Sequence, residues 1–365
     1  MFRPGKIHLV MGGQWGSEAK GKLAGYLALR EPITASVCDF MTNAGHWFRS
    51  KDKGEFLVQQ IPMAAVNPNV QLYVGAGAAI TERTLLREVE QFEKAGISIT
   101  ERLTIDPLAV IIEPHHAEEE MLEIGRISST LKGCGAALAS KVMRKKNVKL
   151  ARDSEMIQDY GIRVARVSDQ IHEILLKNGV VMGELAQGFD LSLNHGMSYP
   201  HVTSRDITPE AFMSNVGISS RYLGDVLGCV RTYPIRVGNV YSGDERVGYS
   251  GGFYPDQAEI DWATISSYIG EKVEERTTVT NKIRRVFTWS DMQYAKFVRH
   301  CGPTALCLQF CNYFPGINAT STLEDMRSSS GLSALVRRIN ALGVPIRWYG
   351  TAADDAAMVE SPGYL

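Results

Sequence analysis

The stretch "GGQWGSEAKGKLAGY", Gly12–Tyr26, directly follows the apolar run Ile7–Met11. An apolar run, a glycine-rich turn and then a helical pattern are typical of a phosphate-binding loop that joins a buried strand to a helix. Gly16 to Lys22 fits the G-x-x-x-x-G-K part of a P-loop, but Leu23 stands where a P-loop carries the hydroxyl that holds Mg²⁺. The stretch therefore predicts phosphate binding on an α/β fold, by a loop that departs from the standard P-loop.

The composition limits the partners that the chain can bind. Lys and Arg number 39 against 40 Asp and Glu, a net charge of −1, so no overall field attracts nucleic acid or an anionic membrane. The first apolar run is too short for a signal peptide, and no stretch reaches the roughly 18 apolar residues of a membrane-spanning helix. We therefore expect a cytoplasmic protein that binds small anions, with neither nucleic acid nor membrane as partner.

The cysteines show no paired spacing, and their surroundings are apolar. We expect reduced, buried thiols that pack in the core, and neither a disulfide framework nor a zinc site, for Cys38, Cys134, Cys229, Cys301, Cys307 and Cys311.

Short apolar runs alternate with helical patterns along the chain. The runs suit buried strands and cover Ile7–Met11, Val70–Val74, Leu103–Ile112, Val180–Leu185, Val230–Val237, Ala305–Phe310 and Pro345–Trp348. The helical patterns cover Lys20–Arg30, Glu82–Lys94, His116–Arg126, Ala136–Lys146, Glu155–Asn178, Asp256–Gly270 and Leu323–Leu342. This alternation predicts an α/β fold with a large, mostly parallel central sheet and helices on both faces. Because no linker or repeat interrupts it, we expect a single domain over residues 1–365.

Glycine-rich or polar segments interrupt the pattern at residues 43–54, 127–135, 186–206, 240–254 and 274–289. In an open α/β sheet, the loops at the carboxyl ends of the strands form the ligand site. Segment 186–206 is long for a connection in a compact domain, and its amide, hydroxyl and histidine content favours an ordered binding loop. We expect the functional residues in these segments.

Three of these segments carry groups suited to anions or to proton transfer. His46 lies beside a glycine and can transfer a proton or donate to a phosphoryl oxygen, although a lone histidine is more often structural. Ser128–Lys146 places hydroxyls at a helix start, with a basic run that is also typical of a solvated face. Glu275–Trp289 places threonines before arginines, which suits a dicarboxylic acid or a phosphate but also a basic edge strand.

Together and in this order, the segments resemble the adenylosuccinate synthetase family, whose members join aspartate to the 6-position of a purine with a nucleoside triphosphate. "GQWGSEAKGK" (13–22) matches the family motif G-Q-W-G-D-E-G-K-G-K at eight of ten positions. "NAGH" (43–46), "STLKGCGAALASKVMRK" (129–145) and "GELAQG…HGMSYPHVTS" (183–204) match its later motifs. The resemblance runs from about residue 7 to 350. It implies a P-loop-like fold with a large sheet, Mg²⁺ as cofactor, and a homodimer in which an arginine crosses to the partner's site.

The resemblance also implies roles for individual residues. The catalytic residues would be Ser17, Lys20, His46 and Gln187. The phosphate loop would be Gly16, Ser17, Glu18, Ala19, Lys20, Gly21 and Lys22. The nucleoside monophosphate would be held by Ser17, Asn43, Ser129, Thr130, Gln187, Thr203 and, from the other subunit, Arg144. Aspartate would be bound by Thr278, Val279, Thr280, Lys282 and Arg284. The base of the triphosphate would be read by Gln309, Asn312 and Gly350. Mg²⁺ would be held by Ser17 and Gly45.

Three departures from the family pattern suggest a changed substrate. Ser17 replaces the aspartate that abstracts the purine N1 proton, and a serine is no comparable base at neutral pH. Its shorter side chain leaves room for a 2-amino group, and its oxygen can accept an N–H bond. Asn312 stands near the family's guanine-reading Lys-x-Asp pair and can pair with adenine, which favours ATP or dATP as donor. Lys282 stands where an arginine near the ribose is expected, which would relax the need for a 2'-hydroxyl.

These features are similar to the bacteriophage branch of the family, which acts on dGMP. Three hypotheses follow from the sequence. The first is an ADP- or dADP-forming ligase that converts dGMP to N6-succino-2-amino-2'-deoxyadenylate for 2-aminoadenine DNA, in the host cytoplasm if the chain is viral. The second is an adenylosuccinate synthetase that acts on IMP, and the third is a catalytically silent nucleotide-binding regulator.

Overall fold

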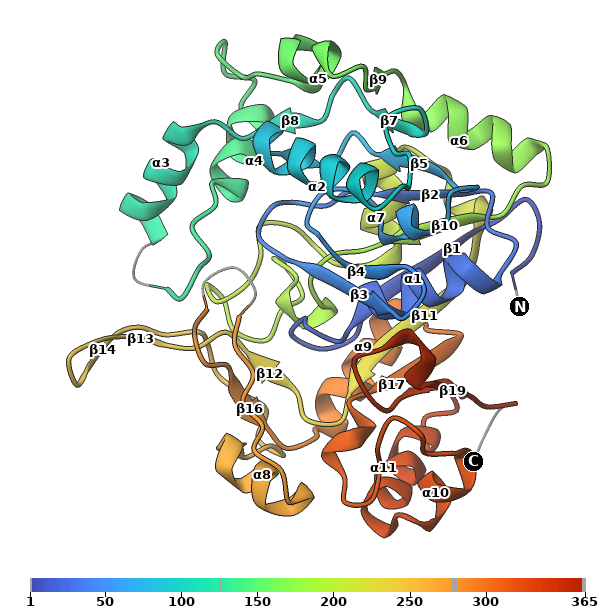
Figure 1. Ribbon diagram of the computed structural model, residues 1–365. Coiled ribbons are helices and arrows are strands. Elements are labelled where there is room, and N and C mark those ends of the chain that lie inside the picture. The colour runs from blue at the N-terminus through green and yellow to red at the C-terminus, as the bar shows by residue number, and fades with distance from the viewer. Residues whose placement is uncertain (1, 125–126, 278–280, 363–365) are drawn as a thin grey trace.

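The computed structural model describes residues 2–124, 127–277 and 281–362 (Figure 1). Its centre is a ten-stranded sheet in the order β19-β18-β17-β11-β1-β10-β2-β5-β7-β9. Neighbouring strands run parallel except β18 and β19, which are antiparallel. The strands are β1 Ile7–Gly12, β2 Ala35–Cys38, β5 Gln71–Val74, β7 Leu103–Ile105, β9 Arg163–Val164, β10 Val181–Glu184, β11 Leu223–Arg231, β17 Ala305–Gln309, β18 Ile346–Gly350 and β19 Met358–Glu360. The predicted large, mostly parallel sheet is confirmed.

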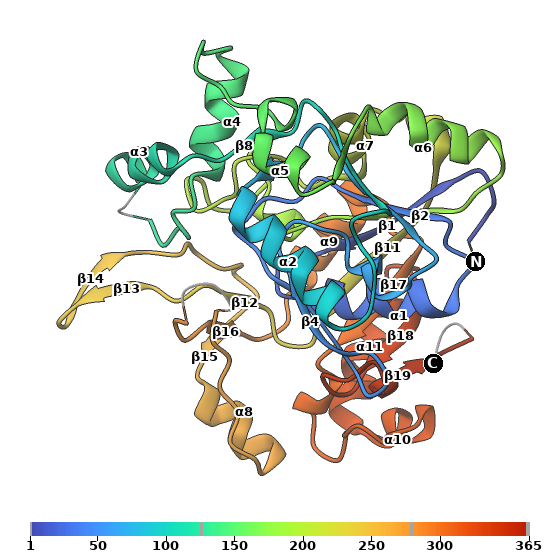
Figure 2. The same cartoon turned by 45° about the horizontal axis from the view of Figure 1, so that its top comes forward.

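Helices cover both faces of this sheet, as predicted (Figures 1 and 2). The helices of the described residues are α1 Lys20–Arg30, α2 Glu82–Lys94, α3 Pro114–Ile124, α4 Cys134–Val142, α5 Glu155–Asp159, α6 Val167–Leu176, α7 Pro209–Val216, α8 Trp262–Ile269, α9 Asp291–Cys301, α10 Leu323–Ser328 and α11 Ser330–Asn340. None of the helices formed by the described residues is long and apolar enough to cross a membrane.

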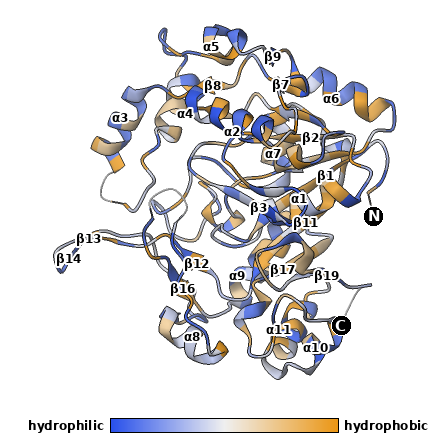
Figure 3. Cartoon of the chain, in the orientation of Figure 1, coloured by the Kyte–Doolittle hydropathy of each residue, from blue (hydrophilic) through white to orange (hydrophobic). Residues whose placement is uncertain are grey.

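Alternate residues of the central strand face opposite sides of the sheet. Val10 packs in one large core cluster with α1 and α2, whereas Leu9 and Met11 pack in a second cluster with α6, α7, α9 and α11. Burial on both faces explains why the central strands read as continuous apolar runs. Helices α2 and α6 carry both hydrophilic and hydrophobic residues, as is typical of helices with one face packed on a sheet (Figure 3).

Smaller sheets frame one end of the central sheet. Strands β12 Ile235–Arg236, β16 Arg285–Phe287 and β15 Glu259–Ile260 form one of them, and β6 Ala79–Ile80 pairs with β8 Val110–Ile111. Two hairpins, β3 His46–Ser50 with β4 Gly54–Val58 and β13 Val240–Ser242 with β14 Glu245–Gly248, include residues of the polar segments 43–54 and 240–254. The second hairpin projects from the body of the protein in both views (Figures 1 and 2).

Several predicted boundaries are wrong because local turns interrupt an apolar pattern. The helix predicted over Glu155–Asn178 is α5, β9 and α6, separated near Gly161, whose φ of +80° ends a helix. The helix predicted over Leu323–Leu342 breaks at Ser329, which has an extended backbone between α10 and α11. The strand predicted over Leu103–Ile112 is β7 and β8 in two different sheets, joined by a turn at Asp106.

Capping and proline positions move three further boundaries. The helix predicted over Asp256–Gly270 begins only at Trp262, because the Asp261 side chain caps it. The helix predicted over Ala136–Lys146 is α4, which ends at Val142 because Arg144 adopts a left-handed C-capping conformation with a φ of 55°. The strand predicted over Val230–Val237 is the end of β11 followed by β12, with Pro234 between them.

Candidate active site

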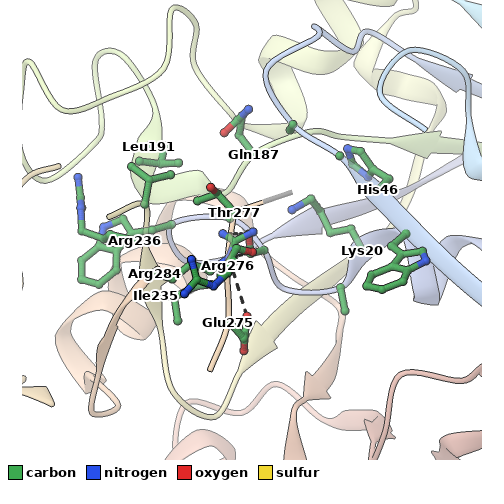
Figure 4. A pocket seen from close by; sticks show the side chains of 18 of the residues that line it. Lys20, His46, Gln187, Leu191, Ile235, Arg236, Glu275, Arg276, Thr277 and Arg284 are labelled. Atoms are coloured by element: carbon green, nitrogen blue, oxygen red, sulfur yellow. Dashed lines mark hydrogen bonds and ion pairs between the residues drawn. The ribbon is translucent and has the colours of Figure 1, made fainter. Parts of the chain in front are cut away.

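A cavity of about 590 Å³ lies beyond the carboxyl ends of the central strands. Each of the polar segments noted in the sequence contributes to its wall, as expected for an open α/β sheet. Lys20 and His46 lie together at one end, Arg236 and Leu191 lie at the other, and Gln187 and Arg284 lie between them (Figure 4). The lining comes from segments 15–22, 43–49, 127–130, 187–203, 235–250, 274–277, 309–313 and 352–353, together with Arg284.

The loop between β1 and α1 is held by a buried carboxylate. Glu18 Oε1 accepts from the backbone N–H of Gln14 at 3.1 Å and of Gly16 at 2.7 Å, while Glu18 Oε2 accepts from Lys20 Nζ at 2.9 Å. Ser17 and Ala19 adopt left-handed backbone conformations, with φ of 56° and 53°. Such strain persists where surrounding contacts fix the chain, and it is common at ligand sites. Glu18 thus shapes the loop from behind, and Lys20 reaches the cavity.

Lys22 lines the cavity, but its ammonium group ties two segments together. Lys22 Nζ donates to the carbonyl oxygens of Ala352 at 2.7 Å and Ala357 at 3.0 Å. Burial lowers the pKa of Lys22 to about 8. The sequence placed Lys22 in the phosphate loop, whereas its bonds in the structure join α1 to the last segment of the chain.

Lys22→Met should therefore destabilise the fold. Removing the ammonium leaves two carbonyl oxygens without this donor, which costs about 1–3 kcal/mol of unfolding free energy. Urea unfolding of Lys22→Met and of the exposed control Lys177→Met tests this. A Lys22→Met protein that is as stable as the control and weak only in nucleotide binding would contradict the structural role.

His46 begins β3 and is buried, with 5% of its surface exposed. Its ring stacks on Phe40 with centroids 4.2 Å apart and planes 16° apart. Burial, and next the positive charge of Lys20, lower the pKa of His46 to about 3. The imidazole is therefore neutral at physiological pH and can donate one N–H bond without carrying a charge.

The pH dependence of kcat/KM for the triphosphate should show no titration of His46. An imidazole of ordinary pKa would become charged below about pH 6.5, whereas a pKa of about 3 keeps His46 neutral across the whole measurable range. His46→Asn should lower the rate by about 100-fold with an unchanged profile from about pH 5.5 to 8. An inflection near pH 6.5 that disappears in His46→Asn would contradict this prediction.

Another part of the cavity wall carries amide and hydroxyl side chains. Gln187 Nε2 donates to Asn43 Oδ1 at 3.0 Å, and the Gln187 backbone is left-handed with a φ of 61°. Ser129, Thr130 and Thr203 line the same cavity. The structure therefore brings these predicted contacts for a nucleoside monophosphate into one site.

Two arginines donate hydrogen bonds to Ser17, and both form ion pairs with the same carboxylate. Arg284 Nη1 donates to Ser17 Oγ at 2.6 Å, and Arg231 Nη1 donates to the Ser17 carbonyl oxygen at 3.0 Å. Both arginines pair with Glu275, which also accepts from the Tyr313 hydroxyl at 2.7 Å. These partners hold the pKa of Glu275 below its usual range, against burial, which raises it.

No sequence motif assigns a role in this site to Arg231, Glu275 or Tyr313, although Glu275 begins the segment Glu275–Trp289. Arg231 belongs to a strand that reads as core, and only its place at the carboxyl end of β11 hints at the site.

A sequence profile described as adenylosuccinate synthetase matches residues 9–152 and 146–321. The chain belongs to the adenylosuccinate synthetase family.

Relatives from two branches of the family have similar identity to the chain. The N6-succino-2-amino-2'-deoxyadenylate synthase of Vibrio phage phiVC8 is 35% identical, over 84% of this chain and 86% of the relative. The adenylosuccinate synthetase of Thermococcus onnurineus is 33% identical, over 82% of each chain. Sequence identity over the aligned chains therefore does not decide to which of the two branches this chain belongs.

A solved structure matches nearly the whole chain. The succinoaminodeoxyadenylate synthetase of cyanophage S-2L, bound to dGMP and dATP as an energy donor, superposes with a TM-score of 0.83. Its sequence is 27% identical, and the match covers 98% of this chain and 95% of that one.

Some residues expected from the family resemblance lie away from the cavity. Gly350 ends β18 with its Cα against the Gln309 side chain, and the neighbouring Ala352 and Ala353 line the cavity instead, beside Gln309 and Asn312. Lys282 does not line it either, and its backbone N–H donates to Thr277 Oγ1 at 2.9 Å. The predicted aspartate contacts Thr278, Val279 and Thr280 fall outside the described residues.

Arg144 follows α4, is exposed and does not line the cavity of its own chain. The expectation that Arg144 crosses to a partner's site stays a prediction.

The described residues offer few ligands for a metal. Within residues 2–124, 127–277 and 281–362, no group of three or more His, Cys, Asp or Glu side chains could hold an ion. Gly45 lines the cavity beside His46, whereas Ser17 Oγ already accepts from the Arg284 guanidinium. All six cysteines are buried and unpaired.

Proposed function

We propose that the chain joins L-aspartate to C6 of the purine of dGMP, with ATP or dATP as phosphoryl donor. The γ-phosphoryl group is placed on O6 of the purine, the aspartate amine then attacks C6, and phosphate leaves. The products are N6-succino-2-amino-2'-deoxyadenylate, ADP or dADP, and phosphate. This activity is a C–N ligase reaction of purine nucleotide synthesis.

The environment of Ser17 is the observation that carries this proposal. The family motif has an aspartate at this position, and the shorter serine leaves space in the cavity where a 2-amino group would project. The Ser17 oxygen can accept a bond from guanine, whereas hypoxanthine has no 2-amino group to offer. The relatives named for this reaction, from phages phiVC8 and S-2L, support the same reading.

Catalysis rests on positioning and charge. Lys20 neutralises the transferring phosphoryl group, and neutral His46 donates an N–H bond to it. The N1 proton passes to water, which leaves negative charge on O6, and Arg284, 2.6 Å from Ser17 Oγ, provides positive charge beside that edge of the ring. The neutral hydroxyl of Ser17 thus replaces the family's aspartate base, and the Arg284 guanidinium donates to that hydroxyl.

The remaining contacts to dGMP, aspartate and the donor base are assigned mainly to residues that line the cavity. Gln187 reads the purine, and Asn43, Ser129, Thr130 and Thr203 hold the sugar and the 5'-phosphate, with Arg144 supplied by the partner of a homodimer. Arg284 binds an aspartate carboxylate, together with the segment Thr278–Thr280. Gln309 and Asn312 face the base of the donor.

Mg²⁺ fits this site as an ion held mainly by the triphosphate. Such ions keep several waters and use one or two protein ligands. The Gly45 carbonyl oxygen is suited to be one of them, whereas Ser17 is a poor ligand because Arg284 donates to its oxygen. When bound, the ion neutralises charge on the phosphates.

Phosphate release measured with one component omitted at a time tests the proposal. With Mg²⁺ and ATP present, release should require both dGMP and aspartate, and GMP should be the poorer substrate. Release with IMP but not with dGMP would indicate the ordinary adenylosuccinate reaction. Nucleotide binding without any release would indicate a silent regulator.

A further inference from the structure

Trp47 is an exposed aromatic residue that the proposed contacts leave unexplained. It is the second residue of β3, half of its surface is exposed (50%), and it lines the cavity. The strand alternates, so Phe48 is buried in the core while Trp47 and Arg49 face outward. Its place in the wall of the cavity puts this exposed ring within reach of a ligand bound there.

The backbone of Trp47 lies against the phosphate loop. A Cβ atom at Gly21 would lie 2.9 Å from Trp47 N and 3.0 Å from Trp47 O, so only glycine allows β3 to cross the first turn of α1 this closely. Lys22 lies in the same turn, and its ammonium group donates to the Ala352 carbonyl oxygen. The backbone of Trp47 therefore lies against the first turn of α1, and β3 also contacts the segment Asp355–Ala357, which follows Ala352 and Ala353.

One neighbour of the indole ring is a fixed cation. The Arg49 guanidinium lies 5.1 Å from the ring centroid, and Glu55 holds it with bonds to Arg49 Nε at 3.2 Å and Nη2 at 3.1 Å. Trp47 and Arg49 line the cavity, as do Ala352 and Asn312.

We propose that Trp47 is the stacking surface for the purine base of the phosphoryl donor. This inference rests on the proposed function, in which the donor is a purine nucleoside triphosphate. An indole ring stacks on any purine because every base has a π-face, so Trp47 contributes affinity. The polar edge of the base is read by groups such as Asn312. Affinity and base choice therefore come from different residues.

Binding measurements on the full chain test the role of Trp47. Isothermal titration without aspartate or dGMP should show that Trp47→Ala weakens ATP and GTP by the same factor, about tenfold. Trp47→Phe should stay within about threefold of the wild type, because it keeps a ring. Inorganic tripolyphosphate has no base and should bind the wild type and Trp47→Ala equally.

A matched control lies directly across the hairpin. Leu57 is the cross-strand partner of Trp47, is 37% exposed and does not line the cavity. Leu57→Ala should therefore leave ATP binding unchanged. Unchanged ATP binding in Trp47→Ala, an equal loss for tripolyphosphate, or an equal loss in Leu57→Ala would overturn the stacking role.

The outcome can be separated from that of the proposed function. ATP binding needs neither dGMP nor aspartate, so failure of dGMP turnover leaves the titration readable. Conversely, dGMP turnover in the wild type combined with unchanged ATP affinity in Trp47→Ala would overturn the stacking role alone. If Trp47→Ala does not fold, Trp47→Leu keeps an apolar side chain without a stacking ring and should show the same tenfold loss.

Discussion

Lys20→Met should lower kcat by about 1,000-fold, the largest effect expected of any single substitution in the site. Lys20 is the cation that reaches the cavity from the phosphate loop, and phosphoryl transfer depends on neutralising charge that develops in the transition state. Single-turnover measurement of phosphate transfer at saturating ATP and dGMP would separate this loss from weaker binding.

The same substitution leaves the buried Glu18 carboxylate without its 2.9 Å partner. Breaking a buried pair in this way costs about 3–5 kcal/mol of unfolding free energy. The double variant Glu18→Gln/Lys20→Met should recover much of that stability, because no unpaired charge remains, and should stay inactive. If the double variant also regains turnover, Lys20 acts on stability and not on the phosphoryl group.

Ser17→Asp should reduce the preference for dGMP over IMP by about 100-fold in kcat/KM. The longer aspartate side chain fills the space beside C2 of the purine. It also forms an ion pair with Arg284, which in the wild type donates to Ser17 Oγ at 2.6 Å. Both changes disfavour the substrate with a 2-amino group. Parallel kcat/KM measurements with dGMP and IMP give the ratio directly.

Ser17→Ala is the matched control for this change, since it removes the oxygen without filling the space. It should lower the rate with dGMP and keep dGMP preferred over IMP. A Ser17→Asp protein with the wild-type ratio would show that position 17 does not set the purine preference.

The sequence predicted best those parts of the fold that depend on local pattern. The helix predicted over Lys20–Arg30 agrees with α1 residue for residue, because a glycine-rich turn precedes it and an apolar face continues through it. Breaks at Gly161 and Ser329 were missed, because apolar spacing continues across both. A two-residue strand such as β9 is defined by its neighbour in the sheet and leaves no periodicity of its own.

The site divides in a similar way. Residues within quoted motifs, such as Lys20, His46 and Gln187, do line one cavity. Arg231 and Arg284, which contact Ser17, lie 214 and 267 positions from it in the chain, and no local sequence pattern indicates such a contact. Lys282 and Gly350 do not line the cavity, and their roles stay predictions, because a motif gives the segment that approaches a ligand but not which of its side chains faces the cavity.

A competition assay tests the central claim most directly. The protein is incubated with Mg²⁺, ATP, aspartate and equal concentrations of dGMP and IMP, and the products are identified by mass spectrometry. The proposed function predicts that the succinylated product of dGMP dominates and that adenylosuccinate is minor. Adenylosuccinate as the main product would contradict it.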